Sequence, residues 1–397
     1  MRLTFLFFVV TSHLSLSAQT FYPQNSGVST QLNAIGFATP SSGIVVGNSG
    51  VIRKTANAGL DWTASSSGTS ADLMDIAPIG PTSYIAVGKA GTMIKTTNSG
   101  TNWSIVNSGT SNDLLSIFVN GQHVYVTGAN GTVLKSSNSG SAWATLSTGI
   151  SLNLNEAYFV SDQVGYVVGD AGTILKTVNA GSTWTFPSSG VSGYSLTSVS
   201  FPDGMNGVIT GGNSGTNQSV ILHSNDAGNN WDSESYPNMF LNDISFSDYI
   251  QGYIAGGSIT GNTSNLYNTT NYGADWSLEP SSSSRQLGVC TPSVSIAYTC
   301  GLNGTILRCT TSTAGIADSE EDINVGISPN PGKGIFSIVS EANTNKTYAV
   351  EIFSVDGQFL FELEDTNEIH LENFPSGVYL AVIRSNSNQV LRRLVKE

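Results

Sequence analysis

The sequence predicts an all-β protein, and three observations favour this class. Charged residues make up only 11% of the 397 residues, while 43 are glycine. Soluble helices fill their surfaces with Lys, Glu and Ala, so a helical bundle is disfavoured. Short apolar runs alternate with Asn- and Gly-containing turns, and one motif recurs along the chain. Hydrophobic residues at 39% still allow a folded core.

The overall charge is acidic, because 15 Lys and Arg stand against 28 Asp and Glu and give a net charge of −13. A nucleic-acid-binding protein needs a basic patch for the phosphates. No nucleic-acid partner is therefore expected.

The first 18 residues have the layout of a secretory signal peptide. Arg2 precedes an apolar run from Leu3 to Val10, and small polar residues follow up to Ala18. That run is too short for a membrane span, and no later stretch approaches the roughly 18 apolar residues that a span needs. We therefore expect residues 1–18 to be removed from an exported chain that does not span a membrane. A buried first strand is the alternative.

Six copies of one motif, each ending in a tryptophan, occupy the middle of the chain. The clearest copies include GTMIKTTNSGTNW at 91–103 and GTILKTVNAGSTW at 172–184. All six tryptophans of the protein end these copies, at Trp62, Trp103, Trp143, Trp184, Trp231 and Trp276. Each unit reads as four short strands with a tight Asn- and Gly-containing turn before the tryptophan. Repeated four-strand units of this length predict a β-propeller.

The two ends of the repeat region are predicted to complete one sheet. Residues 287–309 supply three strands of a seventh unit, but Ile316 falls where a tryptophan is expected. Phe21 stands 41 residues before Trp62, where the aromatic residue of the missing copy belongs. We therefore expect the start of the mature chain to add the fourth strand. This pairing closes a seven-bladed propeller over residues 19–314 and removes an exposed sheet edge.

The repeated T-x-N-x-G-x-x-W motif resembles the Asp-box, or bacterial neuraminidase repeat, and one copy carries its acidic form with Asp226. The whole pattern over residues 19–314 is similar to the propeller family of photosystem II assembly and stability factors. The resemblance implies that each box is a hairpin turn whose polar side chains satisfy backbone groups, with its tryptophan between blades. Metal binding is not expected, because five copies carry Asn where a hard cation prefers a carboxylate.

A second domain is predicted after a small, polar and acidic linker at 315–326. Alternating apolar residues and P-N-P, D-G and S-G turns across 327–397 predict a small antiparallel β-sandwich of the immunoglobulin-like type. The blocks P-N-P-x-x-G-x-F, I-F-S-x-D-G and L-x-N-F-P-S-G-V-Y closely resemble the type A C-terminal sorting domain of the type IX secretion system. That resemblance implies recognition by the outer-membrane translocon, and a location at the cell surface or outside the cell reached through the periplasm. An ordinary adhesion module is the alternative.

No catalytic, cofactor-binding or metal-binding constellation is recognisable in the sequence. A sialidase-like site needs three arginines around a carboxylate, and the propeller arginines are only Arg53, Arg285 and Arg308. A glycoside hydrolase needs two suitably spaced carboxylates, and Glu156, in a predicted first strand, has no evident partner. We therefore expect no catalysis. A glycan-cleaving propeller, sialidase-like or of another glycoside hydrolase type, is the alternative.

Departures from the repeat mark the candidate binding surface. The longest spacings between tryptophans come from extended loops between the second and third strands, at 211–219 and 256–265. We expect these loops to lie side by side on one face, where Asn213, Asn217 and Asn262 offer hydrogen bonds suited to glycans or peptide backbone. Neutral variation of loop length is the alternative. The sequence thus predicts a non-catalytic surface or secreted module that binds or scaffolds an unknown protein or polysaccharide.

Three cysteines, Cys290, Cys300 and Cys309, fall in the last repeat unit. No spacing typical of a zinc site is present. In an oxidising compartment two of them could pair, and the sequence does not say which two. The other interpretation is that all three are small apolar side chains on adjacent strands.

Overall fold

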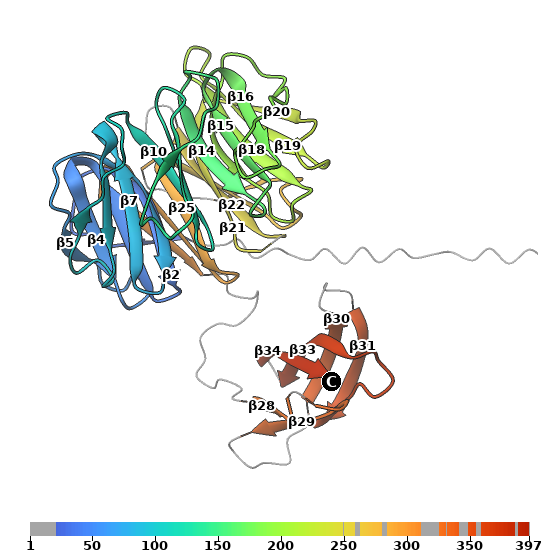
Figure 1. Ribbon diagram of the computed structural model, residues 1–397. Coiled ribbons are helices and arrows are strands. Elements are labelled where there is room, and N and C mark those ends of the chain that lie inside the picture. Colours follow the sequence, from blue (N-terminus) through green and yellow to red (C-terminus); the bar gives the residue numbers. More distant parts are fainter. Residues whose placement is uncertain are drawn as a thin grey trace, which may run out of the picture. The chain divides into compact units, whose positions relative to one another are not determined.

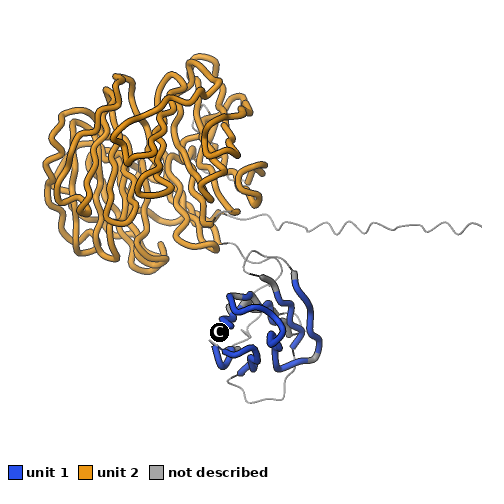
Figure 2. Tube along the Cα trace, turned by 45° about the vertical axis from the view of Figure 1, so that its right-hand side comes forward, with its two compact units in different colours: residues 1–17, 312–397 blue, residues 18–311 orange. Residues whose placement is uncertain are grey.

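The computed structural model describes residues 21–248, 250–258, 263–279, 284–310, 325–330, 332–340, 348–354, 359–385 and 388–396. These residues belong to two compact units, one spanning 18–311 and one containing 312–397 (Figure 2). The predicted signal peptide at 1–18, Ile316 and most of the predicted linker at 315–326 lie outside the described residues. Within the described part of the chain, no helix has the length and apolar character needed to cross a membrane.

Antiparallel sheets make up the larger unit, and the described part of residues 21–310 forms seven of them (Figure 1). From first to last strand, the sheets are β2 (Leu32–Thr39), β3 (Ser42–Gly47), β4 (Val51–Thr55) and β5 (Thr63–Ser66); β6 (Leu73–Gly80), β7 (Ser83–Gly88), β8 (Met93–Thr96) and β9 (Ser104–Ile105); β10 (Leu114–Asn120), β11 (His123–Gly128), β12 (Val133–Ser136) and β13 (Ala144–Thr145); β14 (Leu154–Phe159), β15 (Gly165–Gly169) and β16 (Thr173–Thr177); β17 (Ser195–Ser200), β18 (Gly207–Asn213), β19 (Gln218–Ser224) and β20 (Asp232–Pro237); β21 (Met239–Phe246), β22 (Gly252–Ser258), β23 (Ser264–Thr269) and β24 (Ser277–Glu279); and β25 (Gln286–Ser293), β26 (Ile296–Gly301), β27 (Ile306–Thr310) and β1 (Phe21–Gln24).

These sheets follow one another around a closed ring. The first strand of each sheet contacts the first strand of the next, from β2 and β6 through to β21 and β25, and β25 contacts β2. The ring is completed by the start of the chain, because β1 pairs antiparallel with β27 and places Phe21 opposite Cys309 and Gln24 opposite Ile306. The predicted all-β propeller and its closure by an N-terminal strand are therefore confirmed.

The hydrophobic cores of the ring lie between neighbouring sheets. Trp62 packs against Phe37 of its own sheet and shares a core with Tyr298 of the last sheet. Trp231 packs in the same way against Phe201, in a core that reaches the preceding sheet. The predicted position of the tryptophans between blades is thus confirmed. Only Trp62, at 7% exposure, is buried, and the other five are partly buried.

The repeated turns before the tryptophans satisfy their own backbone groups. In the first copy the Thr55 hydroxyl accepts the Gly59 N–H at 2.9 Å, and the Asn57 side-chain oxygen accepts the Asp61 N–H at 3.0 Å. Gly59 has a φ of 80°, a left-handed conformation that glycine adopts without strain. The motif residues are therefore accounted for by turn geometry.

The repeated lysine before each turn reaches the turn of the next sheet. Lys95 donates to the Ser139 carbonyl at 2.9 Å, and Lys176 donates to the Ala227 carbonyl at 2.6 Å. His223 takes the place of the lysine in β19, and its buried Nε2 has no partner among the described residues. This link between sheets is therefore missing after the β17–β20 sheet.

The smaller unit contains two antiparallel sheets that contribute to one core (Figure 1). The sheets are β28 (Val325–Ser328), β29 (Ile335–Ser340) and β32 (Glu368–His370); and β31 (Phe359–Thr366), β30 (Tyr348–Ser354), β33 (Gly377–Ser385) and β34 (Asn388–Lys396). Phe336 of the first sheet and Ile352 and Ile383 of the second are among the fully buried core residues.

Candidate functional site

The first strands of all seven sheets carry a register irregularity at the same place. Each irregularity directly follows a leucine, or Gln286 in β25, as between Leu73 and Asp75 in β6. Such a bulge leaves a backbone group outside the ladder of the sheet. The residues that end the irregular step in the seven sheets are Ala34, Asp75, Ser116, Glu156, Ser198, Asp243 and Gly288. Three of these seven positions therefore hold a carboxylate.

These three residues, Asp75, Glu156 and Asp243, are called the ring carboxylates below. Each accepts a backbone N–H from the first strand of the next sheet, at a distance of 2.7 or 2.8 Å. The donors are Ile117 for Asp75, Val199 for Glu156 and Val289 for Asp243. The ring carboxylates therefore join neighbouring first strands where the bulge frees a backbone donor.

Burial shifts the protonation of all three ring carboxylates in the same direction. It raises the pKa of Asp75 to about 6 and that of Asp243 to about 7, against a usual value of 3.8. The pKa of Glu156 is raised well above its usual value, first by burial and then by the charge of Asp243. The three residues are partly exposed, but the protein that surrounds their carboxyl groups disfavours the charged form and therefore raises each pKa.

Glu156 therefore has electrostatic partners that were not evident in the sequence. Asp75 and Asp243 were missed as candidates, although each stands two residues after the first leucine of its strand, as Glu156 does. At least one oxygen of each ring carboxylate is used by the next sheet. Within the described residues, no group of three or more His, Cys, Asp or Glu could hold a metal ion. The contacts assign the ring carboxylates a role in joining sheets.

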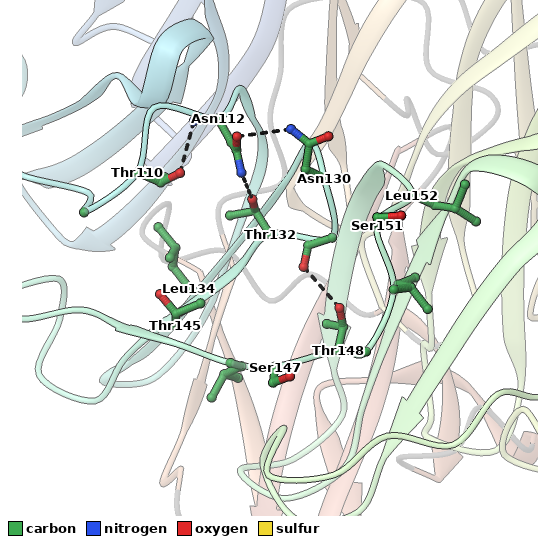
Figure 3. Close-up of a pocket in the computed structure, with 15 residues that line it drawn as sticks. Thr110, Asn112, Asn130, Thr132, Leu134, Thr145, Ser147, Thr148, Ser151 and Leu152 are labelled. Atoms are coloured by element: carbon green, nitrogen blue, oxygen red, sulfur yellow. Dashed lines mark hydrogen bonds between the residues drawn. The ribbon is translucent and has the colours of Figure 1, made fainter.

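A groove of about 850 Å³ lies in the β10–β13 sheet, between the turn after β11 and the segment that leads to β14 (Figure 3). Asn130 donates to the side-chain oxygen of Asn112 at 3.1 Å, and Asn112 donates to the Thr132 hydroxyl at 2.9 Å. Smaller grooves, of about 500 and 460 Å³, occupy matching places in the β2–β5 and β14–β16 sheets. The groove therefore belongs to the repeat, and its amides bind one another.

Both predicted long loops begin and end with residues that belong to strands. Gly211–Asn213 belong to β18 and residues 218–219 to β19, while β22 extends to Ser258 and β23 begins at Ser264. The extra residues therefore lengthen two hairpins, because antiparallel pairing continues past the point where the other sheets turn.

The structure describes two of the three asparagines that the sequence predicted to bind a ligand, Asn213 and Asn217. The side-chain oxygen of Asn213 accepts the N–H groups of Gly215 and Thr216, at 2.9 and 3.2 Å, so it stabilises its own turn. Asn217 has a φ of 56°, a conformation in which asparagine is favoured in turns. Asn262 lies outside the described residues.

On the face that carries these hairpins, the end of a second strand or the turn after it meets, at six places, the residue just before the bulged leucine or glutamine of the next first strand. We call each such meeting point a seam. At four seams polar groups bond across it, as where Asp72 accepts the Ser49 N–H at 2.8 Å and Ser195 donates to Asp170 at 2.6 Å. The other two of these seams join Asp113 to Lys89 and Asn153 to the backbone of Asn130.

The seams after the lengthened hairpins have a different composition. Gly212 faces Phe240 across one seam, and Gly257 faces Arg285 across the next. The Arg285 guanidinium lies over the Phe240 ring, 4.8 Å from its centroid. Burial lowers the pKa of Arg285. These positions carry the clearest departure from the repeat on this face.

The three cysteines lie on consecutive strands of the last sheet, and among the described residues none of them forms a disulfide. Cys300 is buried in the core between the last and first sheets, where Cys290 also packs, whereas Cys309 lies in the core shared with the preceding sheet. Burial raises the pKa of the Cys309 thiol to about 12.

Comparisons with known proteins match both units. Residues 105–178 and 136–279 match the family described as photosynthesis system II assembly factor YCF48, and residues 326–397 match the secretion system C-terminal sorting domain. No curated protein matches the sequence significantly.

Solved structures similar to this chain are propellers. YCF48 bound to D1 peptide is 15% identical with a TM-score of 0.60, covering 75% of this chain and 99% of that chain. YCF48 from Cyanidioschyzon merolae is 15% identical with a TM-score of 0.58, covering 75% and 100%. The WD40 β-propeller domain of Doa1 is 11% identical with a TM-score of 0.58, covering 75% and 98%. At these identities the similarity establishes the fold.

Proposed function

We propose that this protein is an exported, non-catalytic module that binds a protein or polysaccharide. Its chain joins a propeller similar to the photosystem II assembly factors to a C-terminal sorting domain. The sorting domain at 326–397 carries the proposal, because it implies export by the type IX machinery across the outer membrane. The protein is then released or held at the cell surface, where a rigid propeller offers one face to a ligand.

The arrangement of the larger unit supports binding over catalysis. The ring carboxylates, the nearest approach to a hydrolytic pair, each accept a backbone N–H from the next sheet. Departures from the repeat instead gather where β18–β19 and β22–β23 are lengthened. A propeller of this fold has been solved with a peptide, as YCF48 bound to D1 peptide. That structure favours a polypeptide among the ligands of this chain.

Export is tested by deleting residues 327–397 and measuring the protein outside the cell. We expect the truncated chain to accumulate in the periplasm, whereas the full chain reaches the surface or the medium. Equal amounts of both chains outside the cell would contradict the assignment.

Binding and catalysis are separated by two screens of the full mature chain. We expect specific retention of a ligand on a peptide or glycan array, and no turnover of a panel of chromogenic glycosides. Turnover that disappears in Glu156→Gln but persists in Glu234→Gln, a glutamate on the outer strand β20, would establish the hydrolase alternative instead.

A further inference from the structure

We propose that Arg285, stacked on Phe240 at the seam between the last two sheets, binds a carboxylate of a peptide ligand. This inference rests on the proposed binding function and specifies its site and ligand class. The site comprises Arg285 and Phe240, with Gly257 at the end of strand β22 beside Arg285.

The seam of Arg285 differs from the seams that only join sheets. Elsewhere on this face the charged residues at the same position are bonded across their seams: Asp113 accepts Lys89 at 2.8 Å, and Asp72 accepts the Ser49 N–H at 2.8 Å. Arg285 meets Gly257 in place of such a partner. Neither an ion pair nor a hydrogen bond to its guanidinium is present among the described residues. A repeat position that joins sheets elsewhere therefore holds an unpaired cation here.

The glycine opposite Arg285 makes room for its side chain. A Cβ at Gly257 would lie 2.6 Å from both Cβ and Cγ of Arg285, closer than real atoms approach. Glycine is also present at the preceding seam, where a Cβ on Gly212 would be 3.7 Å from the Phe240 ring. That distance is an ordinary van der Waals contact, so Gly257, and not Gly212, is the glycine that the packing requires.

The environment of Arg285 suits an anionic ligand. Its buried Nε has no partner among the described residues, and half-burial of the side chain lowers its pKa. A guanidinium stays charged at physiological pH and presents a planar fork that fits a carboxylate with two hydrogen bonds. Stacking on Phe240 holds the fork in one orientation, which reduces the entropy lost on binding.

A peptide fits this surface better than a sugar. Saccharide binding uses an exposed aromatic face, but the Phe240 ring is covered by Arg285. Among the described residues, the exposed aromatic side chains are Tyr22 on the outer strand β1, Tyr272 at the turn before Trp276, and Phe186, which lines the groove of the β14–β16 sheet. A peptide supplies carboxylates in its acidic side chains and its C-terminus, and YCF48, whose fold is similar, has been solved with a peptide.

The test uses the full mature chain and an array of short synthetic peptides, each present in two forms. The acidic form keeps its Asp and Glu residues and a free C-terminus. In the neutral form, Asn and Gln replace these residues and the C-terminus is a carboxamide. We expect binding of a set of acidic peptides and loss of binding by their neutral forms. For the best binder, Arg285→Gln should weaken affinity by about 10- to 100-fold, the effect of removing a charged hydrogen-bond partner. Arg285→Lys should recover part of this loss.

Lys89→Gln is the matched control, because Lys89 lies on the same face at the position of Gly257 in another sheet. Its affinity should equal that of the wild-type chain. A thermal unfolding midpoint unchanged by Arg285→Gln shows that the variant is folded.

Three results would overturn the inference. They are equal affinity of Arg285→Gln and wild type, equal binding of acidic and neutral peptides, and Arg285-dependent binding of oligogalacturonate without binding of any acidic peptide. In all three cases a ligand is still bound, so the proposed binding function survives. Failure of that function shows instead as glycoside turnover with no ligand retained on either array.

Discussion

The ring carboxylates make the stability of the propeller depend on pH in an unusual direction. Burial raises the pKa of Asp75 from 3.8 to about 6, a shift of roughly two units, and one unit corresponds to about 1.4 kcal/mol. The folded chain therefore binds the proton more tightly than the unfolded chain, and ionised Asp75 lowers the free energy of unfolding by up to about 3 kcal/mol. This penalty is absent below pH 3.8 and complete above about pH 6.

Asp75→Asn removes the charge and keeps one oxygen that can accept the Ile117 N–H, while the Ile76 N–H, which the other oxygen of Asp75 accepts at 2.7 Å, loses its acceptor. Relative to wild type, we expect the unfolding free energy of the variant to rise by up to about 3 kcal/mol between pH 4 and pH 7.5, less a pH-independent cost of about 1 kcal/mol for the lost hydrogen bond. Urea unfolding of the propeller at a series of pH values measures the difference. Asp61→Asn, at an exposed turn, controls for the loss of one negative charge. A variant that is less stable than wild type throughout, or whose advantage does not depend on pH, would refute this reasoning.

Three further predictions concern the packing of the sheets. His223→Lys should restore the missing link to the next turn and raise the free energy of unfolding by about 1 kcal/mol, with His123→Lys as control; no gain in a denaturant titration would argue against it. Gly100→Ala should cost about 2 kcal/mol or more, because its Cβ would lie 2.9 Å from Ile44 Cδ1 at a φ of 73°. Gly109→Ala, with a φ of 77° and open space around it, should cost only about 1 kcal/mol; equal losses would show that the clash is unimportant. The three cysteines should resist alkylation in the native chain and react after denaturation, as measured by mass spectrometry, and rapid native labelling of the buried Cys300 or Cys309 would contradict their burial.

The architecture of the propeller could be predicted because the motif that forms each four-strand unit is repeated in the sequence. Each tryptophan marks the same place in a unit, so one interpretation had to satisfy six copies. The pairing of β1 with β27 followed from spacing, since Phe21 takes the register of a tryptophan that the last unit lacks. A repeat therefore predicts contacts between residues that are far apart in the chain.

The features that distinguish one sheet from another were harder to predict. The interaction of Glu156 with Asp243 and Asp75 depends on a common bulge, which the sequence marks only by a leucine two residues before each carboxylate. Arg285 was considered only as part of an incomplete arginine set, because its stacking on Phe240 requires two sheets to be placed side by side. The insertions read as loops, although their residues continue the antiparallel pairing. Contacts across seams are set by packing and not by local pattern.

Closure of the ring by β1 is tested most directly by hydrogen exchange at β27. In the full mature chain, amides of Ile306–Thr310 that bond to β1 should exchange slowly, while removal of residues 19–24 should expose this edge and speed their exchange by several orders of magnitude. The amides of β12, which do not depend on β1, provide the internal control. Protection of Ile306–Thr310 that is the same with and without residues 19–24 would contradict a propeller closed by its own N-terminal strand.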